Sequence, residues 1–139
     1  MLPDITDVIT KVIIGKKSIV AIHDGVRPLI STKLIDSLID KIKNGIGVIP
    51  IVPVRNSIRK VDAEISTHVD RTDLYQVQTP QCFLSDEIKE SYAQEYSEKF
   101  TDDSSVFENY GGKIITLLGE EKNLKITTEE DLKIASILF

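Results

Sequence analysis

Charged and hydroxyl side chains stand just after several short apolar stretches of the sequence, where they could form one polar binding site. In open α/β sheets, ligands bind beyond the carboxyl ends of the strands. The residues placed in this way are Asp24, Arg27, Arg55, Asn56, Ser57, Thr79 and Lys125. A carboxylate can hold a hard cation and a guanidinium can hold a phosphate. We therefore expect a site for a small anionic ligand.

The residues around Asp24 allow two interpretations. Asp24 could hold Mg²⁺ and a sugar hydroxyl, or the Asp-Gly pair could simply form a turn. Arg27, held extended before a proline, could bind a phosphate with its guanidinium fork or pair with Asp24. We interpret His23 as a structural histidine with satisfied hydrogen bonds rather than as a base.

Four further positions each have a structural and a functional interpretation. Arg71 could be a surface charge or a phosphate ligand that crosses to a neighbouring subunit. Lys125, between two apolar residues and near a helix start, could lie on an exposed edge or face an anion. Thr79 could merely begin a turn, and Thr101 could cap a helix that has acids in its first turn.

A strand–helix–strand unit should position the first of these residues. Residues 18–22 and 46–52 are continuous apolar runs, which indicates strands covered on both faces, as in a parallel sheet. Between them, a helix capped by Ser31 or Thr32 should run to Asn44-Gly45. The crossover should be right-handed.

The segment at about 55–75 is polar and alternating, and it turns at Asp62-Ala63. This pattern predicts a hairpin arm that leaves the body of the domain. Because such an arm is unstable alone, we expect it to pack on a partner subunit and to make the protein a homodimer.

Short helices and strands should alternate in the C-terminal half. Ser85 should cap a helix to about Glu98, and Thr101 should cap another that ends at Gly111-Gly112. QVQ, KIITLLG and NLKI are predicted to be short strands. The last helix, in TTEEDLKIASILF, should begin with a capping box from Thr127 or Thr128.

Composition narrows the class of protein. The chain has 139 residues, enough for one domain, and a net charge of −5, which argues against nucleic acid as a partner. No apolar run is long enough to span a membrane. The N-terminus lacks the basic start of a secretory signal. The single cysteine, Cys82, is predicted to be buried and inert, and we expect a cytoplasmic protein.

Five segments together resemble the methylerythritol-phosphate cytidylyltransferase family. They are HDGVRPLIS, PVRNSIRKVD, VDRTDLYQVQTPQCF, FTDDSSVFENYGGKI and NLKITTEEDLKIA. The resemblance runs from about residue 18 to the C-terminus, in family order and spacing. The related ribitol-5-phosphate cytidylyltransferases share several of these motifs and are the alternative. The resemblance implies an α/β fold, a Rossmann-like nucleotidyltransferase three-layer sandwich, with the arm as a dimerisation hairpin.

The resemblance also implies a reaction and roles for residues. The family joins CTP to 2-C-methyl-D-erythritol 4-phosphate, with Mg²⁺, giving a CDP-alcohol and pyrophosphate in the non-mevalonate pathway of isoprenoid biosynthesis. By resemblance, Asp24 and Lys125 are catalytic and Asp24 also contacts the metal. The substrate-binding residues implied are Arg27, Ser57, Arg71, Thr79 and Thr101.

The start of the chain departs from the family pattern. The Gly-rich loop that cradles the CTP triphosphate, and the segment that reads cytosine, do not occur. We therefore expect residues 1–139 to form one partial domain, truncated at its N-terminus, with MLPDITDVITKVIIGKK matching at most a helix. Loss of the first strands should expose a sheet edge. We predict that this chain alone is inactive. The alternative is a non-catalytic homologue that only dimerises or binds sugar phosphate.

Overall fold

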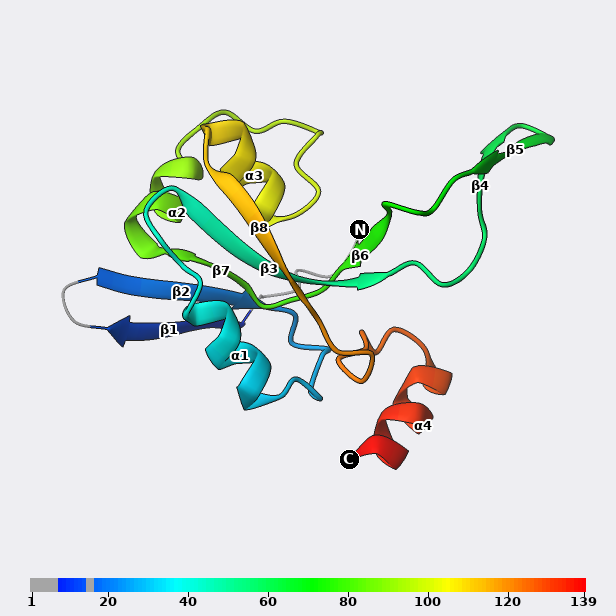
Figure 1. Ribbon diagram of the computed structural model, residues 1–139, viewed down its shortest axis with the longest axis horizontal. Helices are drawn as coiled ribbons and strands as arrows, with labels where there is room; N and C mark the ends of the chain where they lie inside the picture. Colours follow the sequence, from blue (N-terminus) through cyan, green and yellow to red (C-terminus); the bar gives the residue numbers. More distant parts are fainter. Residues whose placement is uncertain (1–7, 15–16) are drawn as a thin grey trace.

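The computed structural model describes residues 8–14 and 17–139, in which a mixed six-stranded sheet forms the centre (Figure 1). The strands, across the sheet, are β1 (Val8–Ile14), β2 (Lys17–His23), β7 (Gln81–Leu84) with β6 (Tyr75–Val77), β3 (Ile46–Pro53) and β8 (Lys113–Leu118). β6 and β7 follow one another along the same edge of β3, and β8 lies along the other.

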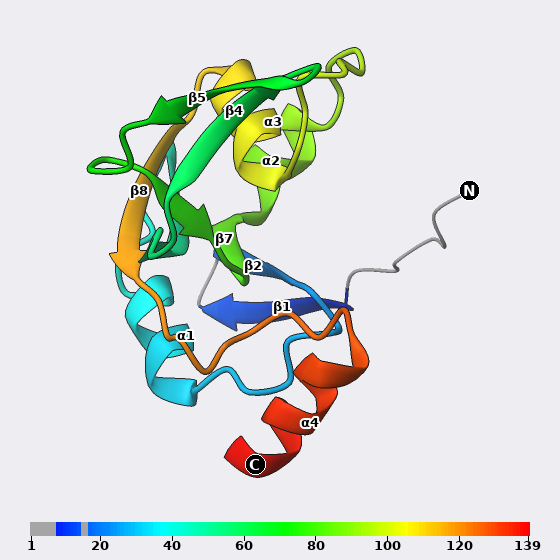
Figure 2. The ribbon, with the colours of Figure 1, turned by 90° about the vertical axis from the view of Figure 1, so that its right-hand side faces the viewer.

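Helices cover both faces of this sheet, which gives the predicted three layers (Figures 1 and 2). On one face, α1 (Thr32–Ile39) packs Leu34 and Leu38 against Ala21, Val48 and Cys82. On the other face, α2 (Ser85–Ser91) and α3 (Asp103–Tyr110) pack on the sheet. The core there consists of Ile22, Phe83, Ile88 and Phe107. Successive strand residues face opposite layers because side chains alternate along a strand.

β2 and β3 are not the direct neighbours in the sheet that their apolar runs would suggest, because β7 lies between them. β2 and β3 both run antiparallel to β7, so they point in the same direction with β7 between them. The prediction that β2 is covered on both faces is confirmed, but its expected parallel pairing is wrong. In the described part of the chain, only β3 and β8 pair in parallel.

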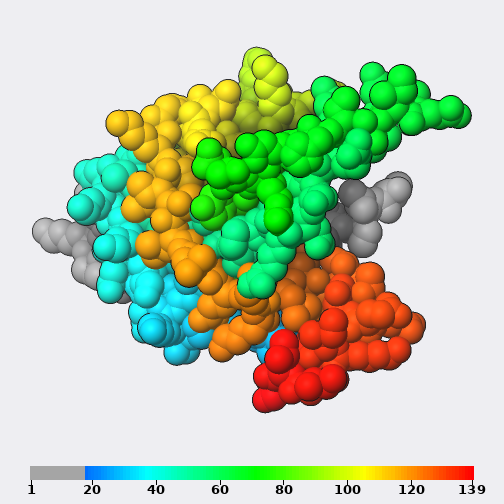
Figure 3. Space-filling model, turned by 45° about the vertical axis from the view of Figure 1, so that its right-hand side comes forward, coloured from blue at the N-terminus to red at the C-terminus, as the bar shows by residue number. Residues whose placement is uncertain are grey.

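The predicted arm is confirmed as a two-stranded hairpin made of β4 (Ile58–Asp62) and β5 (Ile65–Val69). It projects from the body of the molecule, as the space-filling view shows (Figure 3). Ala63 makes the turn with a φ of 52°, in the left-handed region. Two apolar side chains of the arm, Val61 and Ile65, are largely exposed.

Several helix boundaries differ from the sequence predictions. α1 is capped by Ser31 as expected, but it ends at Ile39, before Asn44. α2 ends at Ser91, well before Glu98, and Ser85 is its first helical residue rather than its cap. The N-cap of α3 is Asp102, not Thr101, because its carboxylate accepts the N–H of Ser105. Gly111 ends α3 in the left-handed conformation, as predicted.

The two ends of the chain also differ from expectation. Val8–Ile14 is not helical but forms β1, which pairs with the outer edge of β2 and covers it; this run is rich in the β-branched residues that favour strands. The rest of the N-terminal stretch, residues 1–7 and 15–16, lies outside the described residues. NLKI is not a strand, although α4 (Glu129–Leu138) begins with the predicted Thr128–Asp131 capping box. No helix in the described ranges could cross a membrane.

Candidate functional site

Five of the predicted site residues line one cavity of about 400 Å³ beyond the end of β2. Asp24 and Arg27 come from the loop after β2, Thr79 from the β6–β7 connection, Thr101 from the approach to α3, and Lys125 from the approach to α4. Segments separated by up to a hundred residues therefore meet at one place, as expected for the strand ends of an α/β sheet.

A carboxylate flanked by two cations lines this cavity. The Nε atom of Arg27 lies 3.0 Å from Oδ2 of Asp24, and Nζ of Lys125 lies 3.4 Å from the same oxygen. The N–H of Arg27 also donates to the carbonyl of Asp24 at 3.0 Å. The turn interpretation of Asp24 is confirmed, and this residue also lines the cavity. Its role as a ligand of Mg²⁺ and a sugar hydroxyl stays a prediction.

His23 is a structural residue, as predicted, with both ring nitrogens bonded. Its Nε2 lies 2.9 Å from the carbonyl of Arg27, which can only accept, so Nε2 carries the proton. In the neutral ring, Nδ1 then accepts from the hydroxyl of Thr79 at 3.0 Å. The same hydroxyl oxygen accepts the N–H of Asp24 at 2.9 Å, so His23 and Thr79 fix the loop that carries Asp24.

Two buried amides, Gln78 and Asn123, which the sequence did not reveal, fix the segment that leads to Lys125. Nε2 of Gln78 donates to the carbonyl of Glu120 at 2.9 Å, and Nδ2 of Asn123 donates to the carbonyl of Thr79 at 2.9 Å. The carbonyl of Asn123 accepts from Nη1 of Arg27 at 2.8 Å. These bonds tie the segment before Lys125 to the strand-end loops. Because Asn and Gln are mostly exposed, nothing in the sequence marks them as buried.

The N-terminus of α3 also lines the cavity, and it is held by a second network that the sequence did not reveal. Asp102 Oδ2 accepts from Nε2 of Gln81 at 2.9 Å and from the hydroxyl of Ser104 at 2.7 Å. Oε1 of Gln81 accepts the N–H of Ser104 at 2.8 Å. Burial alone would raise the pKa of Asp102, but the hydrogen bonds from Ser104, Gln81 and Ser105 outweigh it and lower that pKa.

The lining of the cavity carries charges of both signs. Arg27 and Lys125 both pair with Asp24, and Asp102 and Asp103 add two further carboxylates. Cations suit phosphate, and carboxylates suit hydroxyl groups, which donate to them. The chemistry of the lining is therefore compatible with a ligand that carries both phosphate and hydroxyl groups.

Two predicted site residues lie elsewhere. Ser57 and Arg71 belong to the segments that join the arm to the body, and both are exposed. Nη1 of Arg71 donates to the carbonyl of Val54 at 3.1 Å. Neither residue lines the cavity of its own chain. The prediction that Arg71 reaches the site of another subunit stays a prediction.

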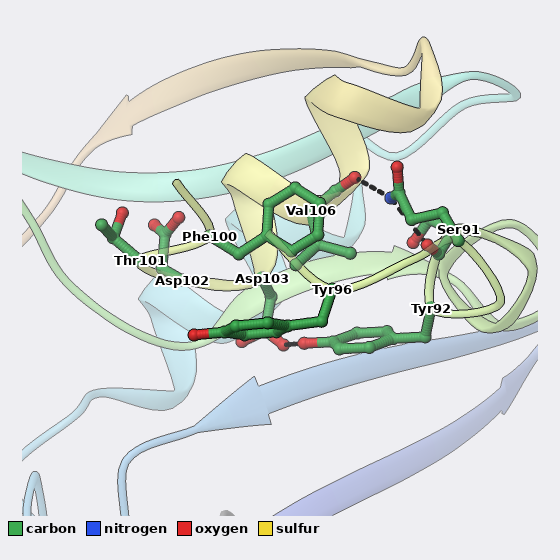
Figure 4. Close-up of a pocket in the computed structure, with 9 residues that line it drawn as sticks. Ser91, Tyr92, Tyr96, Phe100, Thr101, Asp102, Asp103 and Val106 are labelled. Atoms are coloured by element: carbon green, nitrogen blue, oxygen red, sulfur yellow. Dashed lines mark hydrogen bonds between the residues drawn. The ribbon is translucent and has the colours of Figure 1, made fainter. Parts of the chain in front are cut away.

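A second cavity, of about 330 Å³, adjoins the first and shares Thr101, Asp102 and Asp103 with it (Figure 4). Its other side is aromatic. The hydroxyl of Tyr92 donates to the carboxylate of Asp103, and the ring of Tyr96 meets that of Phe100 edge-on at 6.3 Å. These contacts connect the segment after α2 with the start of α3.

The described residues fit a magnesium ion only if the substrate supplies most of its ligands. No group of three or more His, Cys, Asp or Glu that could hold a metal occurs among them. The cavity lining holds three carboxylates, Asp24, Asp102 and Asp103, of which Asp102 is engaged by Gln81, Ser104 and Ser105. Mg²⁺ is commonly bound by one or two carboxylates together with phosphate oxygens and water, so Asp24 would hold the ion only together with substrate oxygens, and the magnesium site stays a prediction.

Comparisons with known proteins agree on one family. Residues 6–139 match the family model described as 2-C-methyl-D-erythritol 4-phosphate cytidylyltransferase. A relative of that name from Azobacteroides pseudotrichonymphae is 43% identical over 129 residues, which cover 91% of this chain and 57% of the relative. One from Porphyromonas gingivalis is 42% identical over 122 residues, covering 87% and 55%.

Solved structures give the same result. The crystal structure of 2-C-methyl-D-erythritol 4-phosphate cytidylyltransferase from Thermus thermophilus superimposes with a TM-score of 0.75 at 28% identity. The match covers 86% of this chain and 61% of that one. The chain thus spans little more than half the length of the curated relatives it matches.

Proposed function

Since this chain belongs to the 2-C-methyl-D-erythritol 4-phosphate cytidylyltransferase family, we propose that its cavity binds the polyol phosphate in the transfer of CMP from CTP to 2-C-methyl-D-erythritol 4-phosphate. The products are a CDP-alcohol and pyrophosphate, and the pathway is isoprenoid biosynthesis. The observation that supports this most directly is that Arg27, Lys125 and three carboxylates, Asp24, Asp102 and Asp103, line one cavity.

In this reaction the substrate phosphate attacks the α-phosphorus of CTP, so negative charge develops where two anions meet. Lys125 neutralises that charge, and Arg27 binds the polyol phosphate. Asp24 holds both cations in place and accepts a hydrogen bond from the polyol. Thr79 and Thr101 line the polyol pocket and orient it for attack. No covalent intermediate with the protein is needed.

Magnesium would bind at Asp24 with phosphate oxygens of the substrates and would neutralise the triphosphate. The CTP end of the site requires residues outside the matched part of the family, because the Gly-rich loop does not occur in this sequence. We therefore expect the 139-residue chain to bind the polyol phosphate without releasing pyrophosphate from CTP.

We further propose that the arm makes the protein a homodimer. A two-stranded hairpin with exposed Val61 and Ile65 is stabilised by packing on a partner. In such a dimer Arg71 would reach the polyol phosphate of the other subunit, with Ser57 nearby on the same arm.

Cys82 is buried and unpaired, which is compatible with the cytoplasm as the compartment.

Calorimetric titration of the chain with each polyol phosphate tests the assignment. We expect 2-C-methyl-D-erythritol 4-phosphate to bind, and Lys125→Gln to weaken binding by about 10- to 100-fold, the value of a charge-assisted contact. Lys89→Gln, an exposed lysine on α2, serves as the matched control and should leave the affinity unchanged. Preference for ribitol 5-phosphate would assign the related enzyme, and binding of neither compound would refute the proposal.

A further inference from the structure

Val77 is the only wholly apolar residue among the described residues that line the cavity of Asp24 and Lys125. Every other residue of that lining carries a carboxylate, amide, hydroxyl, ammonium or guanidinium group. Val77 belongs to β6 and is 43% exposed, so a ligand in the cavity can reach its apolar surface. Phosphate and hydroxyl groups gain nothing from such a surface, which suits an apolar group instead.

The register of the sheet places the side chain of Val77 on the side of α3. Val77 is paired with Ile51 of β3 in an antiparallel ladder, and residues paired in this way share one face of the sheet. Val48 belongs to the core under α1, so Ile51, three residues further along β3, faces the other layer. That layer consists of α2 and α3, and the residues before and at the start of α3 line the cavity.

The contacts of the next residue agree with this placement. Nε2 of Gln78 donates to the carbonyl of Glu120 at 2.9 Å, and the carboxylate of Glu120 accepts from the hydroxyl of Ser31, the N-cap of α1. Gln78 therefore reaches toward the side of α1. Because neighbouring side chains of a strand face opposite layers, Val77 faces the side of α3.

The polyol phosphate of the proposed function carries one group that polar side chains cannot recognise. It differs from D-erythritol 4-phosphate by a methyl group on C2, which forms no hydrogen bond and is stabilised by leaving water. We propose that Val77 is a specificity-determining residue, which contacts this methyl group and selects the branched polyol phosphate over unbranched ones. The inference rests on the proposed function, because only that substrate brings a methyl group into the cavity.

Calorimetric titration of the 139-residue chain with 2-C-methyl-D-erythritol 4-phosphate and with D-erythritol 4-phosphate tests this role. We expect the methylated compound to bind about fourfold more tightly, the value of one buried methyl group. Val77→Ala removes the contact, and Val77→Thr keeps the shape and strand preference of valine but places a hydroxyl there. Both variants should bind the two compounds equally, with the affinity for D-erythritol 4-phosphate unchanged. Ile115→Ala, a residue of β8 that is 36% exposed and outside the cavity lining, is the control and should keep the fourfold preference.

The role of Val77 is overturned if the wild-type chain binds both compounds equally, or if both Val77 variants keep the preference. It is also overturned if the variants weaken the binding of both compounds by the same factor, because Val77 would then support the cavity without reading the methyl group. Each of these results leaves the proposed function intact, since the polyol phosphate still binds. Binding of neither compound to the wild-type chain overturns both.

Discussion

Removing the carboxylate of Asp102 should destabilise the protein by about 1.5–5 kcal/mol. Its Oδ1 accepts the N–H of Ser105 at 2.9 Å, and loss of such an N-cap costs about 0.5–2 kcal/mol. Its Oδ2 is the acceptor for Nε2 of Gln81, a side chain only 2% exposed. A buried donor left without an acceptor costs about 1–3 kcal/mol more. Urea unfolding of Asp102→Ala at pH 7, followed by circular dichroism, measures the sum.

The control is Asp86→Ala, which removes an exposed acid from the first turn of α2 and should change the free energy of unfolding by less than about 0.5 kcal/mol.

The stabilisation by Asp102 should depend on pH, because the pKa of this carboxyl is lowered in the folded state. The stabilisation is present above the ordinary carboxylate pKa of about 4 and is lost as the pH falls through the lowered pKa of the folded state. The difference between wild type and Asp102→Ala should therefore be constant from pH 5 to 7 and shrink below about pH 4. A loss under about 0.5 kcal/mol at pH 7 would refute the network as a source of stability.

Two further predictions concern the core. Gly47→Ala should lower the free energy of unfolding by about 1–3 kcal/mol, because a Cβ there would lie 2.5 Å from Cε1 of Phe83; an unchanged thermal midpoint would contradict this. Cys82 should resist iodoacetamide at pH 8 in the folded protein and react in urea, because burial raises its pKa to about 12; equal labelling rates would contradict this.

The parts of the fold that the sequence predicted well are those coded by local pattern. β2 and β3 follow from continuous apolar runs, and the arm follows from polar alternation around a turn. The end of α2 could not be predicted, because it is set by a distant contact: Nε2 of Gln94 donates to the carbonyls of Ser91 and Val106. NLKI has the composition of a strand, yet Lys125 is held by Asp24 rather than by a neighbouring strand.

In the candidate site, the residues at the ends of predicted elements could be predicted, and the residues that support them through distant contacts could not. Asp24, Arg27, Thr79 and Lys125 stand at the ends of predicted elements, and topology brings such ends together. The supporting amides were missed because their partners are remote in sequence. Asn123, for example, bonds the backbone of Thr79, 44 residues earlier. Such long-range polar pairs leave no periodic signal.

The arm joins the body in a way that lets the arm change without changing the sheet. Pro53 and Tyr75 are paired as neighbours in the sheet, and the N–H of Val54 donates to the carbonyl of Leu74 at 3.3 Å. The chain therefore leaves β3 and returns to β6 between two hydrogen-bonded neighbours. The arm is an insertion into a hairpin, β3–β6, whose own pairing is complete without it. Its length and surface can drift, or be replaced by a short turn, while β3 and the cavity keep their shape. Changes in the arm therefore leave the cavity of its own chain unaltered, whereas any effect on a second subunit would act through Arg71.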